Sequence, residues 1–450
     1  MKRKAILSGL VLTFLTVLSG MKLVAFVFAV LDVVTIQEGK SGGLAASTLD
    51  VIWVPDNYTT IQAAINAANS GDTVIVRNGT YLEHVHVNKT LKLIGENFPI
   101  IRGRHLGFWG QPTLVVEADN ITISGFEIQH ETGRPERDLG ISMSSSYNNI
   151  SNNIIRYTLG AISMNSGCWY NVIANNIIEQ NGGGIGVAGS FNLIIGNFIS
   201  NNSNGVGVAV GSPRNSLISN TISKNSRGIV IWAGDNVIYH NNFVNNTGQV
   251  AVDEGLVNVW DSGYPSGGNY WSHYNGVDFN SGPYQNETGS DGISDSAYVI
   301  DANNTDRYPL IGPISVFDVG VWNGTAYNVD VVSNSTVSNF QLNASQKVIG
   351  FNVTGEGGLG FCRVTIPNAI IQDLWRGNYT VFLNGEPLPF RNWTNAENAY
   401  IYFTYEHPEQ KITIIPEFQS AIILALFIVI TTPTIILHAP SLMKKNYADY

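Results

Sequence analysis

One pattern occurs five times between residues 148 and 252, and it constrains the fold of this chain more than any other feature. Each copy opens with an Asn, and a second Asn follows five positions later. Steps of 23, 21, 23 and 21 residues separate the copies. The two columns are Asn148, Asn171, Asn192, Asn215 and Asn236, and then Asn153, Asn176, Asn197, Asn220 and Asn241. A unit of about 22 residues is shorter than most helical repeats and fits one coil of a solenoid.

Apolar residues keep the same register as the Asn columns. The columns are Ile150, Ile173, Ile194, Leu217, Ile238; Ile155, Ile178, Ile199, Ile222, Phe243; Ile162, Ile185, Val206, Ile229, Val250; and Met164, Val187, Val208, Ile231, Val252. Many of them are β-branched and alternate with period 2, which is typical of strands. The variable part is predicted to be the connection after the last column, at residues 165–170, 188–191, 209–214 and 232–235. We therefore predict an all-β, right-handed parallel β-helix.

In such a fold, strands of successive coils stack about 4.8 Å apart, so equivalent residues lie above one another. The apolar columns would fill a continuous interior. Asn tolerates the left-handed backbone conformation of a turn, and stacked Asn amides hydrogen-bond to each other along the axis. The two Asn columns are thus predicted to be structural and not catalytic.

Composition limits the class of protein. A chain of 450 residues allows two or three domains. Only 13% of the residues are charged and the net charge is -10, which argues against nucleic acid as a partner because phosphate binding needs clustered Lys and Arg. The two cysteines, Cys168 and Cys362, provide no disulfide framework, and a single bond between them stays open.

Both ends of the chain carry apolar segments. Residues 1–34 begin with three basic residues and continue with two apolar runs, which indicates a signal peptide or an uncleaved signal anchor. Residues 418–437 are long enough to form a transmembrane helix, and 438–450 form a short basic tail that would face the cytoplasm. The body is therefore predicted to be exported and membrane-anchored. Its sequons for N-glycosylation support this localisation; they include Asn57, Asn88, Asn120, Asn149, Asn201, Asn245, Asn286, Asn334, Asn352, Asn378 and Asn392.

A short helix is predicted at residues 59–70, with Thr59 or Thr60 as its cap, and it would cover the open end of the first coil. The sequence around it, TIQAAINAANSGDTVIVRNGTYLEHVHVNKTLKLIGEN, resembles the start of pectin-lyase-like β-helix proteins. The repeats resemble those of the NosD-like family, and the resemblance covers about residues 51–312. It implies the β-helix fold. It also raises copper delivery to nitrous oxide reductase as one function, for which His84 and His86, on one strand face, are candidate ligands.

Two insertions interrupt the early coils. Six extra residues lie between Ile128 and Ile141, and nine lie between Leu93 and Leu114. Both leave the solenoid at the same corner of adjacent coils, so we expect them to lie side by side. The first carries Arg102, Arg104, His105, Phe108 and Trp109, and the second carries His130, Glu131, Arg134, Glu136, Arg137 and Asp138.

This mixture of cations, carboxylates and an aromatic ring suits a sugar or uronate ligand, since Arg pairs carboxylates and Trp offers a flat apolar face. The candidate ligand-binding residues are Arg102, Arg104, Trp109, Glu131, Arg134 and Asp138. A polysaccharide lyase, epimerase or hydrolase would need a cation and a base, for which Arg104 or Arg137 and His105 or His130 are candidates. The alternative interpretation is a pair of solvated, salt-bridged loops.

Residues 257–312 break the repeat and are rich in aromatic and acidic side chains. Six aromatics are predicted to close the apolar end of the coil: Trp260, Tyr264, Tyr270, Trp271, Tyr274 and Tyr308. Five carboxylates are hard oxygen ligands of the kind that Ca²⁺ binds: Asp278, Asp291, Asp295, Asp301 and Asp306. No EF-hand spacing is present, so the segment is either a calcium site or a capping loop.

Residues 314–415 change to alternating apolar runs separated by Gly and Asn turns, which predicts a small Ig-like β-sandwich acting as a spacer. Pro416, Glu417 and Phe418, followed by the apolar run and Lys444 and Lys445, resemble the PEF-type C-terminal signals of archaeal surface proteins.

Catalytic residues are sparse in the repeats. Residues 148–250 contain only two acids, Glu179 and Asp235, and their column positions separate them by more than two coils. A glycosidase needs two carboxylates within about 5 to 10 Å of each other, so these two are not such a pair. The sequence therefore favours a cell-surface β-helix that binds a polysaccharide or cell-envelope glycan without catalysis. The enzyme and the copper-delivery protein are the alternatives.

Overall fold

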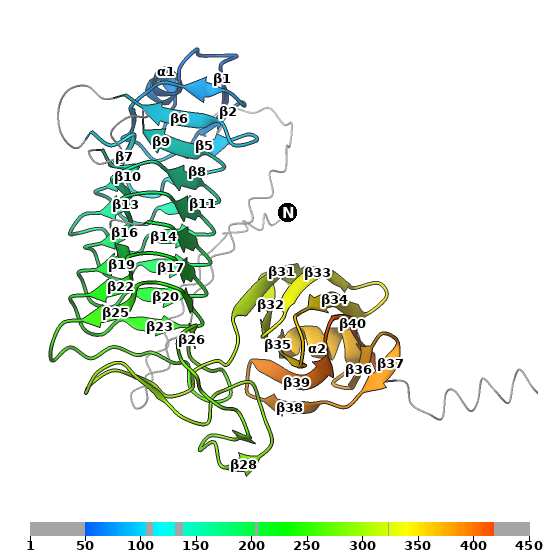
Figure 1. Cartoon of the computed structure of the whole chain (residues 1–450). Helices are drawn as coiled ribbons and strands as arrows, with labels where there is room; N and C mark the ends of the chain where they lie inside the picture. Colours follow the sequence, from blue (N-terminus) through cyan, green and yellow to red (C-terminus); the bar gives the residue numbers. More distant parts are fainter. Residues whose placement is uncertain (1–49, 105–110, 131–137, 203–205, 323, 418–450) are drawn as a thin grey trace, which may run out of the picture.

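The computed structural model describes residues 50–104, 111–130, 138–202, 206–322 and 324–417. Residues 51–252 form a β-solenoid of about eight coils (Figure 1). Each regular coil contributes one short strand to each of three parallel sheets, here called A, B and C in the order in which the chain visits them. Because consecutive strands of one sheet come from consecutive coils, the predicted parallel β-helix is confirmed.

The strands are short. Sheet A contains β1 (Val51–Val54), β2 (Thr73–Val76), β5 (Lys92–Gly95), β8 (Thr122–Ser124), β11 (Asn149–Ser151), β14 (Val172–Ala174), β17 (Leu193–Ile195), β20 (Ser216–Ile218) and β23 (Val237–Tyr239). Sheet B contains β3 (Thr80–Tyr81), β6 (Ile100–Gly103), β9 (Glu127–His130), β12 (Ile154–Arg156), β15 (Ile177–Glu179), β18 (Phe198–Ser200), β21 (Thr221–Ser223), β24 (Asn242–Val244) and β26 (Tyr270–Trp271). Sheet C contains β4 (Val85–Val87), β7 (Leu114–Val116), β10 (Ile141–Met143), β13 (Gly160–Met164), β16 (Gly183–Val187), β19 (Val206–Val210), β22 (Arg227–Ile231) and β25 (Gly248–Val252).

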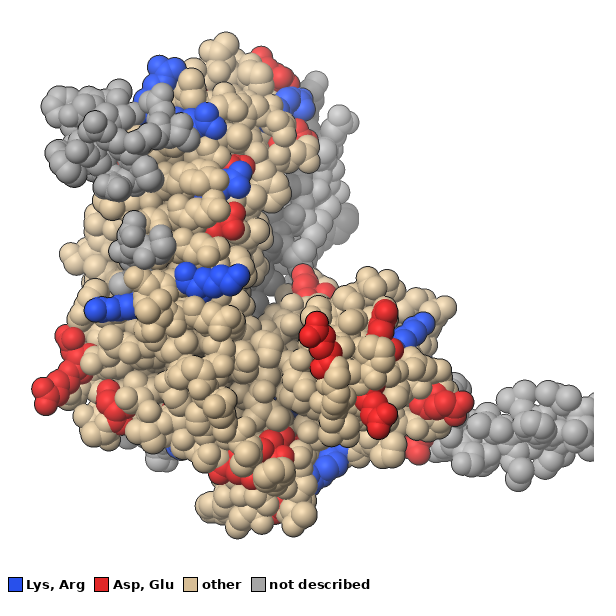
Figure 2. All heavy atoms as spheres, viewed as in Figure 1, with Lys and Arg blue, Asp and Glu red and all other residues tan. Residues whose placement is uncertain are grey.

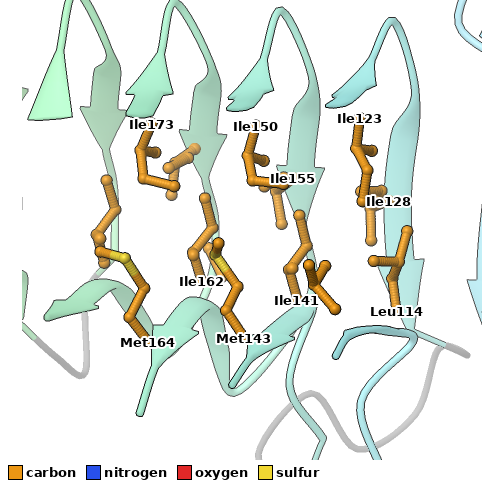
Figure 3. Packing of buried hydrophobic residues seen from close by; sticks show 14 of the residues in the cluster. Leu114, Ile123, Ile128, Ile141, Met143, Ile150, Ile155, Ile162, Met164 and Ile173 are labelled. Atoms are coloured by element: carbon orange, nitrogen blue, oxygen red, sulfur yellow. The ribbon is translucent and has the colours of Figure 1, made fainter. Parts of the chain in front are cut away.

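The interior is built from columns of like residues. Ile123 pairs with Ile150 and Ile150 with Ile173 in sheet A, and Ile128 pairs with Ile155 in sheet B. Figure 3 shows these side chains in successive coils, with Met143 beside Met164 in the same core. All of them are buried, and their removal from water supplies about 25 cal/mol per Å² of apolar surface.

One coil was predicted out of register by two residues, which affects the two columns that contain Val206 and Val208. Ile185 pairs with Val208, and Val208 pairs with Ile229, whereas the sequence pattern had placed Val206 at that level. The connection after β19 therefore spans residues 211–214, and the two additional residues precede the strand. The segment Val206–Val210 reads Val-Gly-Val-Ala-Val, and a shift of two keeps the same residues on the same face, so its periodicity cannot fix the register.

The predicted Asn columns are buried ladders. The side chain of each Asn accepts a hydrogen bond at Oδ1 from the backbone N–H of the equivalent Asn one coil earlier. For example, Asn176 N and Nδ2 both donate to Asn197 Oδ1, at 3.0 Å each. The second hydrogen of Asn176 Nδ2 binds the carbonyl oxygen of Ile150 in the preceding coil at 2.8 Å. Each such amide thus joins three coils, and both of its N–H donors have acceptors.

A third ladder was not predicted. It starts at Thr158, whose hydroxyl donates to Asn181 Oδ1 at 2.8 Å, and continues through Asn202, Asn225 and Asn246. Its members lie five positions after the second column, so the same spacing rule applied once more would have found it. The three ladders occupy the three corners of the coil.

The N-terminal end of the solenoid is covered by α1 (Ile61–Ala67). Thr60 caps this helix, because its hydroxyl accepts a hydrogen bond from the backbone N–H of Ala63 at 3.1 Å. Ile61, Ala64 and Ile65 are fully buried against the first coils. The helix ends at Ala67, earlier than predicted, since the backbone is already extended at Ala68.

The other end is closed by the aromatic segment, as predicted. Trp271 stacks on Phe243 with ring centroids 4.4 Å apart, and Trp260 lies beside it. The middle Asn ladder continues through Asn269 and ends at Asp306, whose Oδ2 accepts hydrogen bonds from Asn269 N at 2.8 Å and Trp271 Nε1 at 2.9 Å. Burial raises the pKa of Asp306 to about 7, and these N–H donors oppose that shift.

Two five-stranded antiparallel sheets follow the solenoid. The first is ordered β31 (Ile314–Trp322), β32 (Thr325–Ser333), β35 (Leu359–Pro367), β39 (Asn398–Glu406) and β38 (Arg391–Thr394). The second is ordered β33 (Thr336–Asn343), β34 (Val348–Thr354), β40 (Glu409–Pro416), β36 (Tyr379–Leu383) and β37 (Glu386–Leu388). The helix α2 (Asn368–Trp375) was not predicted, and it buries Ile370, Ile371, Leu374 and Trp375 in their common core.

A buried arginine joins this second unit to the closing segment of the solenoid. Arg363 in β35 is 1% exposed, and its guanidinium donates to the carbonyl oxygens of Asp291, at 2.6 Å, and Pro265. It also lies 4.8 Å from the centre of the Tyr400 ring. Tyr264 and Tyr308, which were predicted to plug the coil, pack instead with Ile293 and Phe361 at this joint.

The predicted signal segment (1–34) and transmembrane helix (418–437) lie outside the described residues. Within residues 50–417, apart from the short gaps named above, no helix has the length and apolar character needed to cross a membrane. Cys168 and Cys362 are both buried free thiols, in the solenoid and in the antiparallel unit respectively.

The ladders predict that replacing a single ladder asparagine greatly lowers the stability of the fold. Asn197→Ala would leave buried donors and acceptors in three coils without partners, and each such group costs about 1–3 kcal/mol. We expect the free energy of unfolding, measured by chemical denaturation, to fall by several such increments. Asn175→Gly is the matched control, because Asn175 is an exposed turn residue with a φ of 54° that Gly also adopts, and it should change stability little. Equal stability of the two variants would contradict a role for the ladder.

Candidate functional site

The two insertions leave the solenoid side by side at the corner between sheets B and C. Arg102 pairs with Gln129 and Gly103 with His130 where the insertions begin, and Leu114 pairs with Ile141 where they end. The predicted adjacency of their bases is therefore confirmed. His105, Phe108, Trp109, Glu131, Arg134, Glu136 and Arg137 lie outside the described residues, so their assignment as sugar-binding or catalytic groups stays a prediction.

His84 fastens the two ends of the first insertion together. Its Nδ1 lies 2.8 Å from the carbonyl oxygen of Pro112, and its Nε2 lies 2.7 Å from that of Arg104. The backbone N–H of Arg104 is also 3.1 Å from Nε2. The imidazole thus occupies the space between positions 104 and 112. It is a structural clamp at the base of the insertion.

Asp138 fastens the two insertions to each other. Its Oδ1 accepts a hydrogen bond from the backbone N–H of Gln111 at 2.9 Å, and its Oδ2 lies 3.1 Å from Nε2 of His130. Both side chains are almost completely buried, with 2% of His130 and 1% of Asp138 exposed. A general base must reach the proton that it removes, so a ring buried in this way is poorly placed for catalysis. We assign His130 and Asp138 a positioning role.

Close packing at the same place explains Gly103. A Cβ atom on this residue would lie 2.5 Å from Thr113 Oγ1, 3.0 Å from a ring carbon of His130 and 3.3 Å from one of His84. The two His rings have centroids 6.4 Å apart, on either side of this glycine. Sequence reasoning had grouped His84 with His86; the structure places His84 near His130 instead, because a fold of stacked coils brings residues together across coils.

A row of polar side chains runs from this corner along the outer face of sheet B. The residues in register are Arg102, Gln129, Arg156, Glu179, Ser200 and Ser223. Arg102 donates to Gln129 Oε1 at 3.0 Å, and Arg156 Nε donates to Glu127 Oε1 at 2.8 Å. Arg156 also lies 3.9 Å from Glu179. We call this row, with Glu127, the sheet B ladder. Its side chains are held in fixed orientations by one another.

Beside the ladder lies a second outward column with apolar members. Ile177 is 41% exposed and Phe198 is 43% exposed, and they pair with each other in adjacent coils. Arg156 and Glu179 retain 31% and 29% exposure. Figure 2 shows that most of the solenoid surface in view is uncharged, with isolated acidic and basic side chains along it. Sheet B therefore offers oriented hydrogen-bonding groups next to an apolar strip.

The described residues do not form a copper site. His84 is engaged with backbone carbonyls, His86 is exposed on β4, and Met143 and Met164 are buried in the core. Across the described ranges, no group of three or more His, Cys, Asp or Glu side chains is arranged to hold a metal ion. The donor set that Cu ions favour is therefore not gathered there.

Each of the five carboxylates proposed for Ca²⁺ accepts hydrogen bonds from N–H groups of the closing segment. Asp278 caps the amides of Asp291 and Gly292, at 3.0 and 2.8 Å, and Asp295 caps those of Phe279 and Asn280. Asp301 accepts from Asn303 and Asn304, and Asp291 accepts from Ile293. Burial raises the pKa of Asp278 to about 7. This pattern matches the capping-loop alternative.

The clamp geometry predicts that Asp138→Ala destabilises the corner. The variant leaves the buried Gln111 amide and the His130 ring without their carboxylate, so we expect a loss of about 2 kcal/mol or more in unfolding free energy. Asp253→Ala, at an exposed position after β25, is the control and should stay within about 0.5 kcal/mol. Thermal unfolding followed by circular dichroism would measure both. A neutral Asp138→Ala variant would refute the clamp.

Comparisons with known proteins agree with the geometry of the coils. Residues 65–276 match the family model described as "Periplasmic copper-binding protein (NosD)". No curated protein matches the chain. Similar solved structures include an alginate lyase from Paenibacillus sp. str. FPU-7 (13% identity, 48% of this chain and 95% of that chain, TM-score 0.31) and the Dettilon tailspike protein (11%, 81% and 93%, 0.35). The pectin methyl esterase of rice weevil is a third (16%, 58% and 87%, 0.29). Together, the matched family model and the observed coils make residues 65–276 a NosD-like parallel β-helix.

Proposed function

We propose that this chain is an exported, membrane-anchored surface protein that binds a polysaccharide without catalysis, through the outer face of sheet B and the corner beside it. The observation that carries the proposal is the sheet B ladder, in which Arg102, Gln129, Glu127, Arg156 and Glu179 are linked into one fixed network. Arg156 and Glu179 are 31% and 29% exposed, whereas Gln129 and Glu127 are buried and hold the network in place.

A polymer of sugars needs what this face offers. Its hydroxyl and carboxyl groups would bind the oriented guanidinium of Arg156 and the carboxylate of Glu179, and Arg pairs with carboxylates in a bidentate manner. The apolar faces of its rings would lie against Ile177 and Phe198, which are both about two-fifths exposed. Because one polar side chain occupies this position in each successive coil, an extended ligand would meet polar groups at a regular spacing along the axis. Preorganised side chains lose little conformational entropy when they bind.

The remaining parts of the chain fit a display role. We infer that residues 1–34 direct export and that the apolar run 418–437, preceded by a PEF-like motif of archaeal type, anchors the protein to the membrane. The two antiparallel sheets would then form an Ig-like spacer between membrane and solenoid. Arg363, buried at the joint, would keep the solenoid in a fixed orientation on this spacer.

The choice against catalysis rests on the positions of the candidate groups. Among the described residues, His130 is buried behind Asp138, and the backbone of Arg104 is held by His84. The carboxylates of Glu127 and Glu179 both face the guanidinium of Arg156. We therefore propose that the polar side chains of this face bind a polysaccharide and do not cleave it.

Arg156→Ala tests the proposal. We expect the full chain to bind a uronate polymer such as polygalacturonate or alginate, and the variant to lose about tenfold in affinity or more, since hydrogen bonds to charged groups contribute about 1.5–3 kcal/mol. Binding would be measured by isothermal titration or affinity electrophoresis.

The matched control is Arg227→Ala, which removes the same charge from an exposed position on sheet C and should leave the affinity unchanged. Equal affinity of the Arg156 variant and the unmodified chain would refute binding at the sheet B ladder. Release of unsaturated sugar from either polymer would show a lyase instead.

A further inference from the structure

A row of exposed aromatic side chains lies on a different corner of the solenoid, between sheets C and A. Tyr147, Tyr170 and Phe191 occupy the same position in three successive coils, immediately before the first Asn ladder. Their rings stack, with centroids 5.3 and 5.2 Å apart and planes within 13° and 18° of parallel. Trp169 precedes Tyr170 on the same corner. We call these four residues the aromatic ridge.

The ridge is not required by the geometry of the turn. At each of the three corners, one residue per coil has a positive φ. At the corner between sheets A and B these residues are Asn152, Asn175, Gly196, Ser219 and His240, and at the corner between B and C they are Tyr157, Gln180, Asn201, Lys224 and Asn245. Apart from Tyr157 and His240, non-aromatic side chains serve this conformation elsewhere, and Asn is among the best suited to it. Only the corner between C and A carries three aromatic residues in a row, with φ values of 60°, 56° and 59°.

The ridge side chains remain largely in contact with solvent. Tyr147 is 55% exposed, Trp169 51%, Tyr170 47% and Phe191 41%. Stacking of aromatic rings recovers about 0.5–1.5 kcal/mol per pair, yet roughly half of each ring surface is left in water. Contiguous exposed apolar surface of this kind marks an interaction site.

The surroundings of the ridge are rigid, and charged residues lie at the two ends of the row. At one end, Asp119 Oδ1 accepts a hydrogen bond from the backbone N–H of Ser146 at 2.8 Å. Ser146 accepts a hydrogen bond from the backbone N–H of Trp169 at 3.0 Å, and the N–H of Tyr147 donates to the carbonyl of Trp169 at 3.0 Å. Along this corner the turns 144–147, 165–170 and 188–191 contain no Asp, Glu, Lys or Arg. Arg214 ends the row, with its guanidinium carbon 5.6 Å from the centre of the Phe191 ring.

These features select one kind of ligand. The ridge is a single column of side chains on a convex corner, whereas a stable protein interface needs about 800 Å² from each partner. Its contacts repeat with the rise of one coil, so they suit an extended polymer with a repeating unit of similar length. The ridge turns themselves carry no charged residue, and this favours a neutral polymer over an acidic one. Tyrosine hydroxyls supply hydrogen bonds beside the apolar ring surface.

We propose that the aromatic ridge binds a neutral polysaccharide, whose pyranose rings present their apolar C–H faces to Trp169, Tyr147 and Tyr170. This surface is separate from the sheet B ladder, and its assignment does not depend on binding there. Two surfaces of different chemistry on one rod would allow it to contact two polymers, one acidic and one neutral.

The test is co-sedimentation of the full chain, in mild detergent, with insoluble cellulose and chitin as neutral probes. We expect binding to both or to one of them, and the double variant Tyr147→Asn, Tyr170→Asn to reduce the affinity about tenfold, as loss of central aromatic contacts does at other interfaces. Asn is chosen because the other corners carry it in the same conformation, so the fold should persist. Trp169→Ala, outside the positive-φ positions, should weaken binding as well.

Tyr157→Asn is the matched control, since Tyr157 has a φ of 61° and 37% exposure but lies on the corner between sheets B and C. It should bind like the unmodified chain. Failure to bind either neutral probe, or undiminished binding by the double variant, would overturn the ridge assignment. A fall in melting temperature with unchanged binding would show that the stack is only structural. Arg156→Ala, by contrast, should leave the binding of neutral probes unchanged, so the two sites are tested independently.

Discussion

The structure depends on the buried amide of asparagine. Each ladder residue in the middle of the solenoid donates to the next coil, donates to a carbonyl of the coil before and accepts at Oδ1, so the group that is most costly to bury is completely satisfied. The apolar columns supply the larger favourable free energy, but they are not selective for register, because any β-branched residue fits them. The ladders fix which residue of one coil lies above which residue of the next.

The different roles of the apolar columns and the Asn ladders explain what could and could not be predicted from the sequence. Asn148 and its equivalents predicted the coils, the strand register and the buried columns, because an amide satisfied by its neighbour must recur at a fixed place. The register of β19 was predicted wrongly, since Val206 and Val208 alternate with small residues and differ by two positions on the same face. The third ladder was overlooked because its first member is Thr158 and not Asn.

The candidate site was harder to predict, because its residues are brought together across coils and between insertions. Counting residues located both insertions at one corner, and the pairing of Gly103 with His130 agrees with that count. The same count could not show that His84 and Asp138 have their polar atoms directed at backbone groups. His84, a candidate for copper binding, and His130, a candidate for catalysis, thus lie at the bases of the insertions and contact groups that hold them together. The aromatic ridge also has a sequence signal, an aromatic residue before three successive ladder Asn residues, but only exposure and ring geometry distinguish it from core.

The direction of the ladders gives the rod a polarity. In the middle ladder, each Asn donates its backbone N–H and one side-chain N–H toward the C-terminal end, so an unfinished stack would end in donors without oxygen partners from the coil that follows. Asp306 meets this demand for the middle ladder with a carboxylate, the strongest acceptor that the chain has. If coils are added in the order of synthesis, the middle ladder ends at Asp306, a residue that differs chemically from the ladder asparagines. A chain truncated before Asp306 would expose unpaired N–H donors at the end of the solenoid, and these could bind acceptors of neighbouring molecules.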